Sequence, residues 1–192
     1  PETVLTIPYA LKRSTKVFHD HERHPDQRLT TAGVLAVSSN TGSIKIGEML
    51  SNDKLYDYLT KFGIGTKTGS GLPGESRGIL RKVADWSGTT APTVAFGQGY
   101  SLTAMQATSV FATIANDGVR VSPTVIAGKS DSSGNYTPSA TRESVRVISA
   151  DTAAKMRLMM ESVVSSNGTA PSAAIPGYRV AGKTGTAQRI DD

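Results

Sequence analysis

The sequence predicts an α+β fold, because helical and extended periodicities occupy separate stretches of the chain. Apolar residues recur at helical spacing across 101–116 and again from about 151 to 164. Short runs with strand character lie at 4–8 and 16–19 near one end and at 178–188 near the other. A chain of 192 residues with these patterns is long enough to bury a core.

The first half of the chain predicts a broken helix. Thr30 or Thr31 can cap a helix, and we expect Gly42 to interrupt it before apolar spacing resumes across 44–50. The stretch 38–40 lies at this break. A separate helix capped by Ser51 or Asn52 is expected to run to Gly63, and a glycine-rich loop to follow across 63–78.

The second half predicts two longer helices. The helix across 101–116 is almost uncharged, so we expect it to be buried. Its predicted inward face comprises Met105, Thr108, Phe111, Ala112 and Ala115. The later helix is capped by Ser149 or Asp151, with Ala153, Met156, Met160 and Val163 inward. Residues 131–135 form an exposed turn, and strands are expected at 124–126, 145–148 and 178–188.

Composition narrows the function classes. A net charge of +5 would suit nucleic acid or an anionic wall polymer, but aromatic residues make up only 6% and no basic run alternates with them. Nucleic acid is therefore not expected as a partner. Cysteine is absent, which excludes disulfides and thiol catalysis. No apolar run approaches the ~20 residues of a membrane span, so any anchor is expected outside these residues.

The residues that carry most chemistry close the last predicted strand. Lys183 supplies a positive charge, and Thr184 supplies a directional hydroxyl donor. Gly185 leaves a stretch of backbone bare, so that a peptide-like substrate can pair with the strand. The backbone N–H near Thr186 can face a developing oxyanion. This set suits acyl transfer on a peptide that carries a carboxylate.

Similar short motifs occur elsewhere and are assigned to structure. Lys67-Thr68-Gly69 repeats the triplet, but it lies in the glycine-rich loop with no strand before it. Two further Ser-x-Asn matches, at 133–135 and 165–167, lie in a turn and just after a helix. Ser51 and Lys54 form the one Ser-x-x-Lys of the sequence. We reject Ser51 as a nucleophile, because a helix cap already accounts for this stretch.

Ser38-x-Asn40 followed by Lys183-Thr184-Gly185 gives two of the three signatures of penicillin-recognising serine enzymes. The whole chain resembles the transpeptidase domain of class B penicillin-binding proteins, of the cell-division type. The resemblance is carried by VSSNTG (37–42), KFGIG (61–65), GSGLPGE (69–75), FGQGYSLT (96–103), IANDG (114–118) and AGKTGTAQ (181–188). The tripeptide Trp86-Ser87-Gly88 resembles the corresponding sequence of the actinobacterial members of this family.

The resemblance implies a fold in which helices flank an antiparallel sheet, with a helical subdomain that contributes Ser-x-Asn. It also implies a peptidoglycan D,D-transpeptidase that acylates a serine with a D-Ala-D-Ala stem peptide, and that binds β-lactams. Ser38 would relay a proton, and Asn40 would hold the substrate amide and the catalytic lysine. Lys183 and Thr184 would bind the carboxylate, and Gly185 and Thr186 would complete substrate binding, with the Thr186 N–H in the oxyanion hole. No cofactor is implied.

By the same resemblance, the chain is the middle-to-late part of one domain. We expect residues 30–120 to form a mainly helical subdomain, and 121–192 to supply a helix and the active-site strand. The nucleophile's Ser-x-x-Lys motif would precede Pro1. Expected partners are stem peptides, a lipid-linked precursor, β-lactams and cell-division proteins. The expected location is the extracytoplasmic face of the bacterial membrane, with the anchor outside this chain.

Three alternatives remain open. One is a D,D-carboxypeptidase or β-lactamase, in which water replaces the acceptor amine. Another is a noncatalytic module of the same fold that binds peptidoglycan or a division partner. His19, His21 and His24 could also bind zinc, although a solvated polar turn accounts for them without metal.

Overall fold

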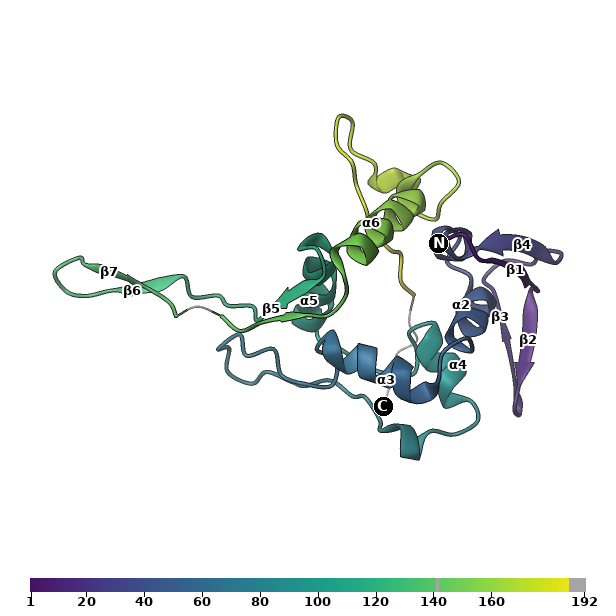
Figure 1. Cartoon of the computed structure of the whole chain (residues 1–192), viewed down its shortest axis with the longest axis horizontal. Helices are drawn as coiled ribbons and strands as arrows, with labels where there is room; N and C mark the ends of the chain where they lie inside the picture. Colours follow the sequence, from purple (N-terminus) through teal and green to yellow (C-terminus); the bar gives the residue numbers. More distant parts are fainter. Residues whose placement is uncertain (141, 187–192) are drawn as a thin grey trace. The chain divides into compact units, whose positions relative to one another are not determined.

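The computed structural model describes residues 1–140 and 142–186 (Figure 1). Its strands are β1 (Val4–Ile7), β2 (Ala10–Arg13), β3 (Lys16–His19), β4 (Gln27–Thr30), β5 (Val119–Val121), β6 (Gly128–Ser130), β7 (Tyr136–Pro138) and β8 (Ser144–Arg146). Its α-helices are α1 (Thr31–Ala36), α2 (Asn40–Gly47), α3 (Asn52–Lys61), α4 (Thr90–Ala95), α5 (Ala104–Ala115) and α6 (Ala150–Val164). Short 3₁₀ turns occur at η1 (Val83–Asp85) and η2 (Pro171–Ala173).

The strands of the described residues pair antiparallel in four two-stranded sheets: β1 with β4, β2 with β3, β5 with β8, and β6 with β7. Register places Leu5 opposite Leu29 and Leu11 opposite Phe18. The α+β class predicted from the sequence is therefore confirmed. Within the described part of the chain, no helix combines the length and apolar character that crossing a bilayer requires.

The chain divides into two compact units that interleave along the sequence. The first contains Pro1–Asp57, Arg81–Tyr100 and the chain from Ala154 onward. The second contains Tyr58–Leu80 and Ser101–Ala153. Helix α6 thus begins in the second unit and continues in the first. The predicted subdomains, 30–120 and 121–192, stay a prediction.

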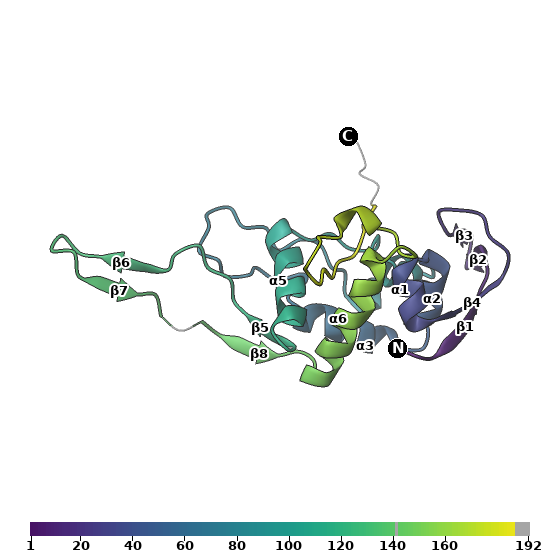
Figure 2. The same cartoon turned by 90° about the horizontal axis from the view of Figure 1, so that it is seen from above.

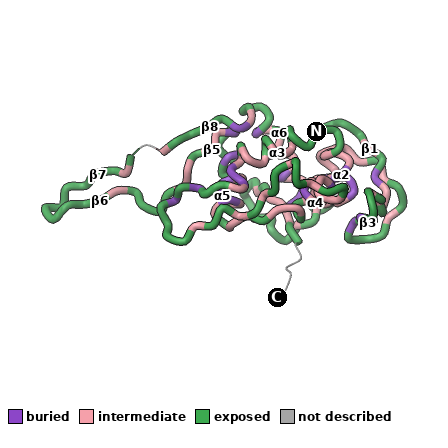
Figure 3. Tube along the Cα trace, turned by 90° about the horizontal axis from the view of Figure 1, so that it is seen from below, coloured by how far each residue is buried: buried purple, intermediate pink, exposed green. Residues whose placement is uncertain are grey.

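In the first unit, the paired strands β1 and β4, strand β3, and helices α1, α2 and α4 contribute to an apolar core. Its buried side chains include Ile7, Phe18, Val34, Ile44 and Val94. Figure 3 colours the buried residues purple along the trace of the chain. Helix α2 packs on α4, where a Cβ added at Gly47 would lie 2.8 Å from the Cβ of Ala95. This close approach requires glycine at position 47.

The predicted helix break lies at a different residue from the one expected. Thr30 caps α1 by accepting a hydrogen bond from the Gly33 N–H, as expected. Gly42, however, lies inside α2 rather than at the interruption. A Cβ at position 42 would lie 2.7 Å from Val34 Cγ1, so this glycine allows α2 to pack against α1. The prediction was wrong because helix packing, and not helix termination, requires this glycine.

In the second unit, α5 begins with the capping box of Thr103 and Gln106. Its buried residues are Gln106, Ser109 and Thr113, whereas Phe111 is 44% exposed, so the predicted inward face was wrong. Gln106 explains the difference, because its Nε2 donates to the carbonyls of Gly63, Thr66 and Arg77. The buried side-chain amide of Gln106 thus holds the glycine-rich loop. The spacing of apolar residues in the sequence does not predict that this polar side chain is buried.

Outcomes differ among the remaining expected elements. Ser51 and Ser149 cap α3 and α6 as predicted, and Asp131 organises the expected exposed turn. The β6–β7 hairpin continues from the β5–β8 pair (Figure 2). The prediction of a strand at 124–126 was wrong, because the strand that pairs with β7 is β6, which begins at Gly128.

The last predicted strand is not paired in the described residues. No described strand forms a ladder with 178–186, and positions 187 and 188 lie outside the described residues. The Gly182 N–H instead donates to the Met160 carbonyl at 3.2 Å. A strand exists only through hydrogen bonds to a neighbour, and this requirement cannot be read from the segment's own sequence.

Candidate active site

Two of the predicted site residues meet in the first unit although 145 positions separate them. The Lys183 Nζ donates a hydrogen bond to the Ser38 Oγ at 2.6 Å. The same ammonium donates to the Thr184 carbonyl at 2.9 Å. A lysine and a serine hydroxyl held at this distance can share and relay a proton, and can together hold an anion.

The chain geometry around Ser38 is unusual. Ser38 lies between α1 and α2 with φ of 55°, in the left-handed region that non-glycine residues seldom adopt. Ser39 then caps α2 by accepting a hydrogen bond from the Gly42 N–H. Asn40 is the first residue of α2, and its Nδ2 donates to the His19 carbonyl at 3.1 Å. Hydrogen bonds within the protein therefore define the shape of the turn.

Lys183 is partly buried, and this changes its acidity. Burial lowers the pKa of the Lys183 ammonium from its ordinary value near 10.5, because removing the charge from water disfavours the protonated form. The Thr184 hydroxyl lies 2.8 Å from that of Thr169. Gly185 and Thr186 are exposed. The segment thus leaves polar groups available on a surface that includes Ser38.

A carboxylate beneath the turn was not singled out from the sequence. Asp20 is 7% exposed and accepts hydrogen bonds from the Ser39 Oγ at 2.7 Å and the Thr41 N–H at 2.9 Å. The His24 Nε2 also contacts the Asp20 Oδ2 at 3.0 Å. The signal available in the sequence was an acidic residue directly after β3, within the polar stretch that we considered as a zinc site or a solvated turn.

The histidines have separate local partners. His19 stacks on Tyr9 and contacts the Asp20 carbonyl through Nδ1, whereas His24 contacts the Asp20 carboxylate. Within residues 1–140 and 142–186, no group of three His, Cys, Asp or Glu side chains is arranged to hold a metal ion.

The competing motifs have structural contacts. Thr68 is buried, and its N–H donates to the Glu75 Oε1 at 2.6 Å, while Lys67 is exposed. Hydrogen bonding from Thr68 lowers the pKa of the Glu75 carboxyl. Ser51 accepts the Lys54 N–H as a helix cap. These contacts agree with the structural assignments made from the sequence.

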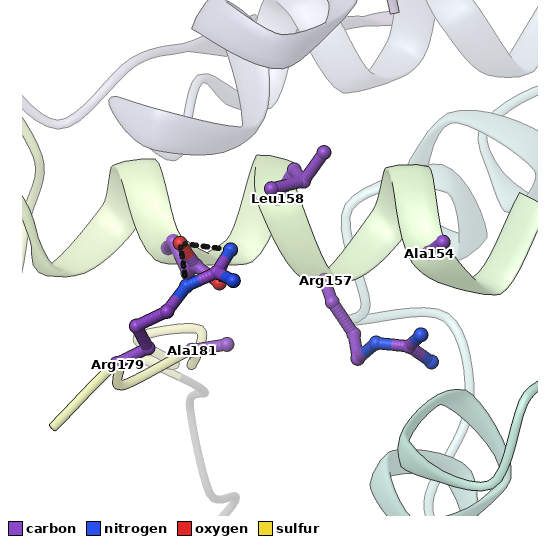
Figure 4. Close-up of a pocket in the computed structure, with 6 residues that line it drawn as sticks. Ala154, Arg157, Leu158, Arg179 and Ala181 are labelled. Atoms are coloured by element: carbon purple, nitrogen blue, oxygen red, sulfur yellow. Dashed lines mark hydrogen bonds and ion pairs between the residues drawn. The ribbon is translucent and has the colours of Figure 1, made fainter.

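A pocket of about 390 Å³ lies beside α6 and the segment that leads to Lys183 (Figure 4). Its lining residues are Ala154, Arg157, Leu158, Glu161, Arg179 and Ala181. The Arg179 Nη2 lies 2.8 Å from the Glu161 Oε1, which ties the segment to the helix. Since Ser38 and Lys183 do not line it, this pocket is not the candidate site.

Comparison with known families is consistent with this geometry. The model described as "Penicillin binding protein transpeptidase domain" matches residues 1–192. Penicillin-binding protein PbpB of Mycobacterium tuberculosis is 41% identical over the whole chain, and the chain spans 29% of that protein. Peptidoglycan D,D-transpeptidase FtsI of Escherichia coli is 36% identical over 96% of the chain, which spans 29% of it. The chain therefore covers less than a third of either relative.

Solved structures show the same similarity. Penicillin-binding protein 3 of Mycobacterium tuberculosis, in complex with aztreonam, matches with a TM-score of 0.96 at 41% identity. That match covers all of this chain and 44% of the other. The transpeptidase domain of Burkholderia pseudomallei penicillin-binding protein 3 matches with a TM-score of 0.83 at 32% identity, over 95% of this chain and 53% of the other.

Proposed function

Because this chain belongs to the penicillin-binding protein transpeptidase family, we propose that it supplies the substrate-anchoring part of a peptidoglycan D,D-transpeptidase. The observation that carries the proposal is the hydrogen bond from Lys183 to Ser38, because it joins the two motif-bearing segments in one site. The names of the D,D-transpeptidase relatives support the reaction class.

The proposed donor is a stem peptide that ends in D-Ala-D-Ala. Lys183 and Thr184 bind its terminal carboxylate, and Gly185 leaves the backbone edge open to pair with the peptide. Charge-assisted hydrogen bonds of this kind are about twice as strong as neutral ones. Burial lowers the pKa of the Lys183 ammonium from its ordinary value near 10.5, and a bound carboxylate would favour the charged form.

The nucleophile is proposed to be a serine outside these residues, activated by a lysine one helical turn away. Its Oγ attacks the carbonyl carbon of the penultimate D-Ala, and the Thr186 N–H stabilises the oxyanion. Ser38, hydrogen-bonded to Lys183, passes a proton to the departing terminal D-Ala amine. Asn40 holds the substrate amide and the catalytic lysine. An amine of a neighbouring stem then attacks the acyl-enzyme ester and frees the serine.

The proposed cellular setting is supported by the names of the relatives. We propose that the complete protein cross-links septal wall at the extracytoplasmic face of the membrane, using lipid-linked precursors and alongside division proteins. β-Lactams would acylate the same serine as donor mimics. The relative solved with aztreonam supports this inhibitor class.

The test uses the complete transpeptidase domain with a stem-peptide donor and a second stem that offers an amine. Mass spectrometry should detect the cross-linked dimer with loss of one D-Ala. Hydrolysed donor without dimer would assign the protein to the carboxypeptidases or β-lactamases. A folded domain that forms neither product nor a β-lactam adduct would favour the noncatalytic module and overturn the proposal.

A further inference from the structure

The Ser38–Asn40 turn is held from beneath by a single buried carboxylate. Asp20 Oδ2 accepts the Ser39 hydroxyl at 2.7 Å, and Asp20 Oδ1 accepts the Thr41 N–H at 2.9 Å. These donors come from the residues on either side of Asn40. Because Asp20 is only 7% exposed, water has little access to compete for these two hydrogen bonds. The carboxylate therefore fixes the backbone on both sides of Asn40.

The residue before Asp20 completes the support. The His19 carbonyl accepts the Asn40 amide Nδ2 at 3.1 Å, which sets the orientation of that amide and leaves its Oδ1 outside this bond. His19 is the last residue of β3, and together with Asp20, which follows it, it contacts three consecutive residues, Ser39, Asn40 and Thr41.

The support has a reason in the backbone. Ser38 has a φ of 55°, and a non-glycine residue keeps such a conformation only where the surrounding structure over-determines it. The bonds from Ser39 and Thr41 to Asp20 provide that constraint on the C-terminal side of Ser38. The hydrogen bond between the Ser38 Oγ and the Lys183 Nζ depends on the resulting side-chain direction.

Asp20 is in turn paired with His24. The His24 Nδ1 lies 2.7 Å from the Pro25 carbonyl, and its Nε2 lies 3.0 Å from the Asp20 Oδ2. Both partners are acceptors, so both ring nitrogens must carry a proton for both bonds to form. The Pro25 carbonyl, followed by the Asp20 carboxylate, raises the pKa of His24 above its ordinary value near 6.5.

The surroundings of His24 include a second carboxylate, an aromatic ring and a guanidinium. Asp26 also favours the protonated imidazole. The Tyr9 ring meets His24 edge-on and His19 in a stack, and the Arg23 guanidinium lies 5.7 Å from the same ring's centre.

We propose, on the basis of the transpeptidase function above, that Asp20 is a positioning residue for the Ser38–Asn40 turn and that protonated His24 holds its carboxylate in place. Neither residue touches substrate. Asp20 acts through Ser39 and Thr41, and His24 acts through Asp20. The hydroxyl of Ser38, the proposed proton relay, is therefore aligned by the buried carboxylate of Asp20, which bonds to the neighbouring Ser39, and by its partly buried partner His24.

The experiment uses the complete transpeptidase domain and compares Asp20→Asn and His24→Gln with the parent. Asp131→Asn is the matched control, because Asp131 also accepts two backbone N–H groups in a turn, at Ser133 and Asn135. Stopped-flow acylation by penicillin, followed to saturation, separates the acylation rate constant from noncovalent affinity. Circular dichroism and Tm report the folded fraction.

For Asp20→Asn we expect the acylation rate constant to fall about tenfold, as for loss of a hydrogen bond to a charged group, with noncovalent affinity nearly unchanged. The control should match the parent. A folded Asp20→Asn protein that acylates at the parent rate overturns the proposal. Failure of the parent itself to acylate would instead overturn the proposed transpeptidase function.

His24→Gln gives a test that does not depend on Asp20→Asn folding. A raised pKa means that the contribution of His24 is fully present below its ordinary pKa and is lost as pH rises through its folded pKa. The ratio of parent to His24→Gln acylation rates should therefore be largest below about pH 6.5 and approach one at higher pH. A ratio that does not change with pH, or that equals one throughout, overturns the role of His24.

Discussion

Two Lys-Thr-Gly triplets in one chain have opposite environments. At 183–185 the lysine is partly buried and donates to the Ser38 hydroxyl, while the glycine is exposed. At 67–69 the lysine is exposed, and the threonine is buried against the Glu75 carboxylate. The first triplet presents its polar groups beside a second motif, whereas the second uses its threonine to close a loop.

This difference shows which part of the motif carries information. Three residue types can bind an anion only if the lysine is held near a second polar group and the backbone is open. In the loop, Gly69 has a φ of 75°, which serves a turn. The contacts made by each triplet, rather than its letters, distinguish a site from a structural loop.

The largest expected effect comes from mutating the lysine of each triplet. In the complete domain, Lys183→Ala should slow acylation by penicillin by about thirty- to a hundred-and-fiftyfold, because an anchored carboxylate loses a charged partner worth about 2–3 kcal/mol. Lys67→Ala should acylate at the parent rate. Stopped-flow kinetics on folded proteins measures both. Equal rates for the two variants would remove Lys183 from the site.

A pH profile sharpens the role of the same lysine. Because burial lowers the pKa of Lys183, binding of an anionic β-lactam should decline as pH rises through a value below the ordinary 10.5. In Lys183→Arg the charge persists over this range, so this decline should be absent. The measurement is acylation rate against pH for both proteins. An identical decline in the arginine variant would assign it to another group.

Local signals predicted much of the fold, and long-range contacts account for what was missed. Caps at Thr30, Ser51 and Ser149 were predictable, because each involves residues within three positions. Gln106 was not, since its partners are loop carbonyls far along the chain. A glycine needed for helix packing, Gly42, was mistaken for a helix break for the same reason.

The candidate site shows the same limit. Resemblance to a family pointed to Ser38, Asn40 and Lys183, and the structure brings Lys183 to Ser38, while their catalytic roles stay predictions. Asp20 was passed over because its value lies in what it contacts nineteen residues later, at Ser39. The polar stretch around Asp20 indicated a zinc site or a solvated turn, and nothing in it pointed to a contact with Ser39.

A smaller effect on stability is expected when the glycine of each triplet is replaced by alanine. Neither Gly69 nor Gly185 would place a Cβ within 4 Å of another group, but only Gly69 has a positive φ. Gly69→Ala should therefore lower the free energy of unfolding by about 1–2 kcal/mol through backbone strain. Gly185→Ala should change it by less than about 0.5 kcal/mol. Thermal or urea unfolding of the two variants decides, and equal losses would contradict the distinction.

The smallest effect concerns the carboxylate that holds the loop. Hydrogen bonding from Thr68 lowers the pKa of Glu75, so its contribution to stability is present above the ordinary pKa near 4.5 and is lost as pH falls through the folded pKa. The Tm of the parent should exceed that of Glu75→Gln at neutral pH, and the difference should shrink in acid. A gap that is constant with pH would show that the charge of Glu75 is not involved.

Lys183 and Ser38 are proposed to form the anchoring half of a transpeptidase site. A crystal structure of the complete domain acylated by a β-lactam would show directly which residues bind the drug. The predicted result places the drug's carboxylate within hydrogen-bond distance of Lys183 and Thr184, with the acyl group on a serine outside residues 1–192. A carboxylate bound at Lys67, or an acyl group on Ser38, would contradict the proposed roles of Lys183 and Ser38.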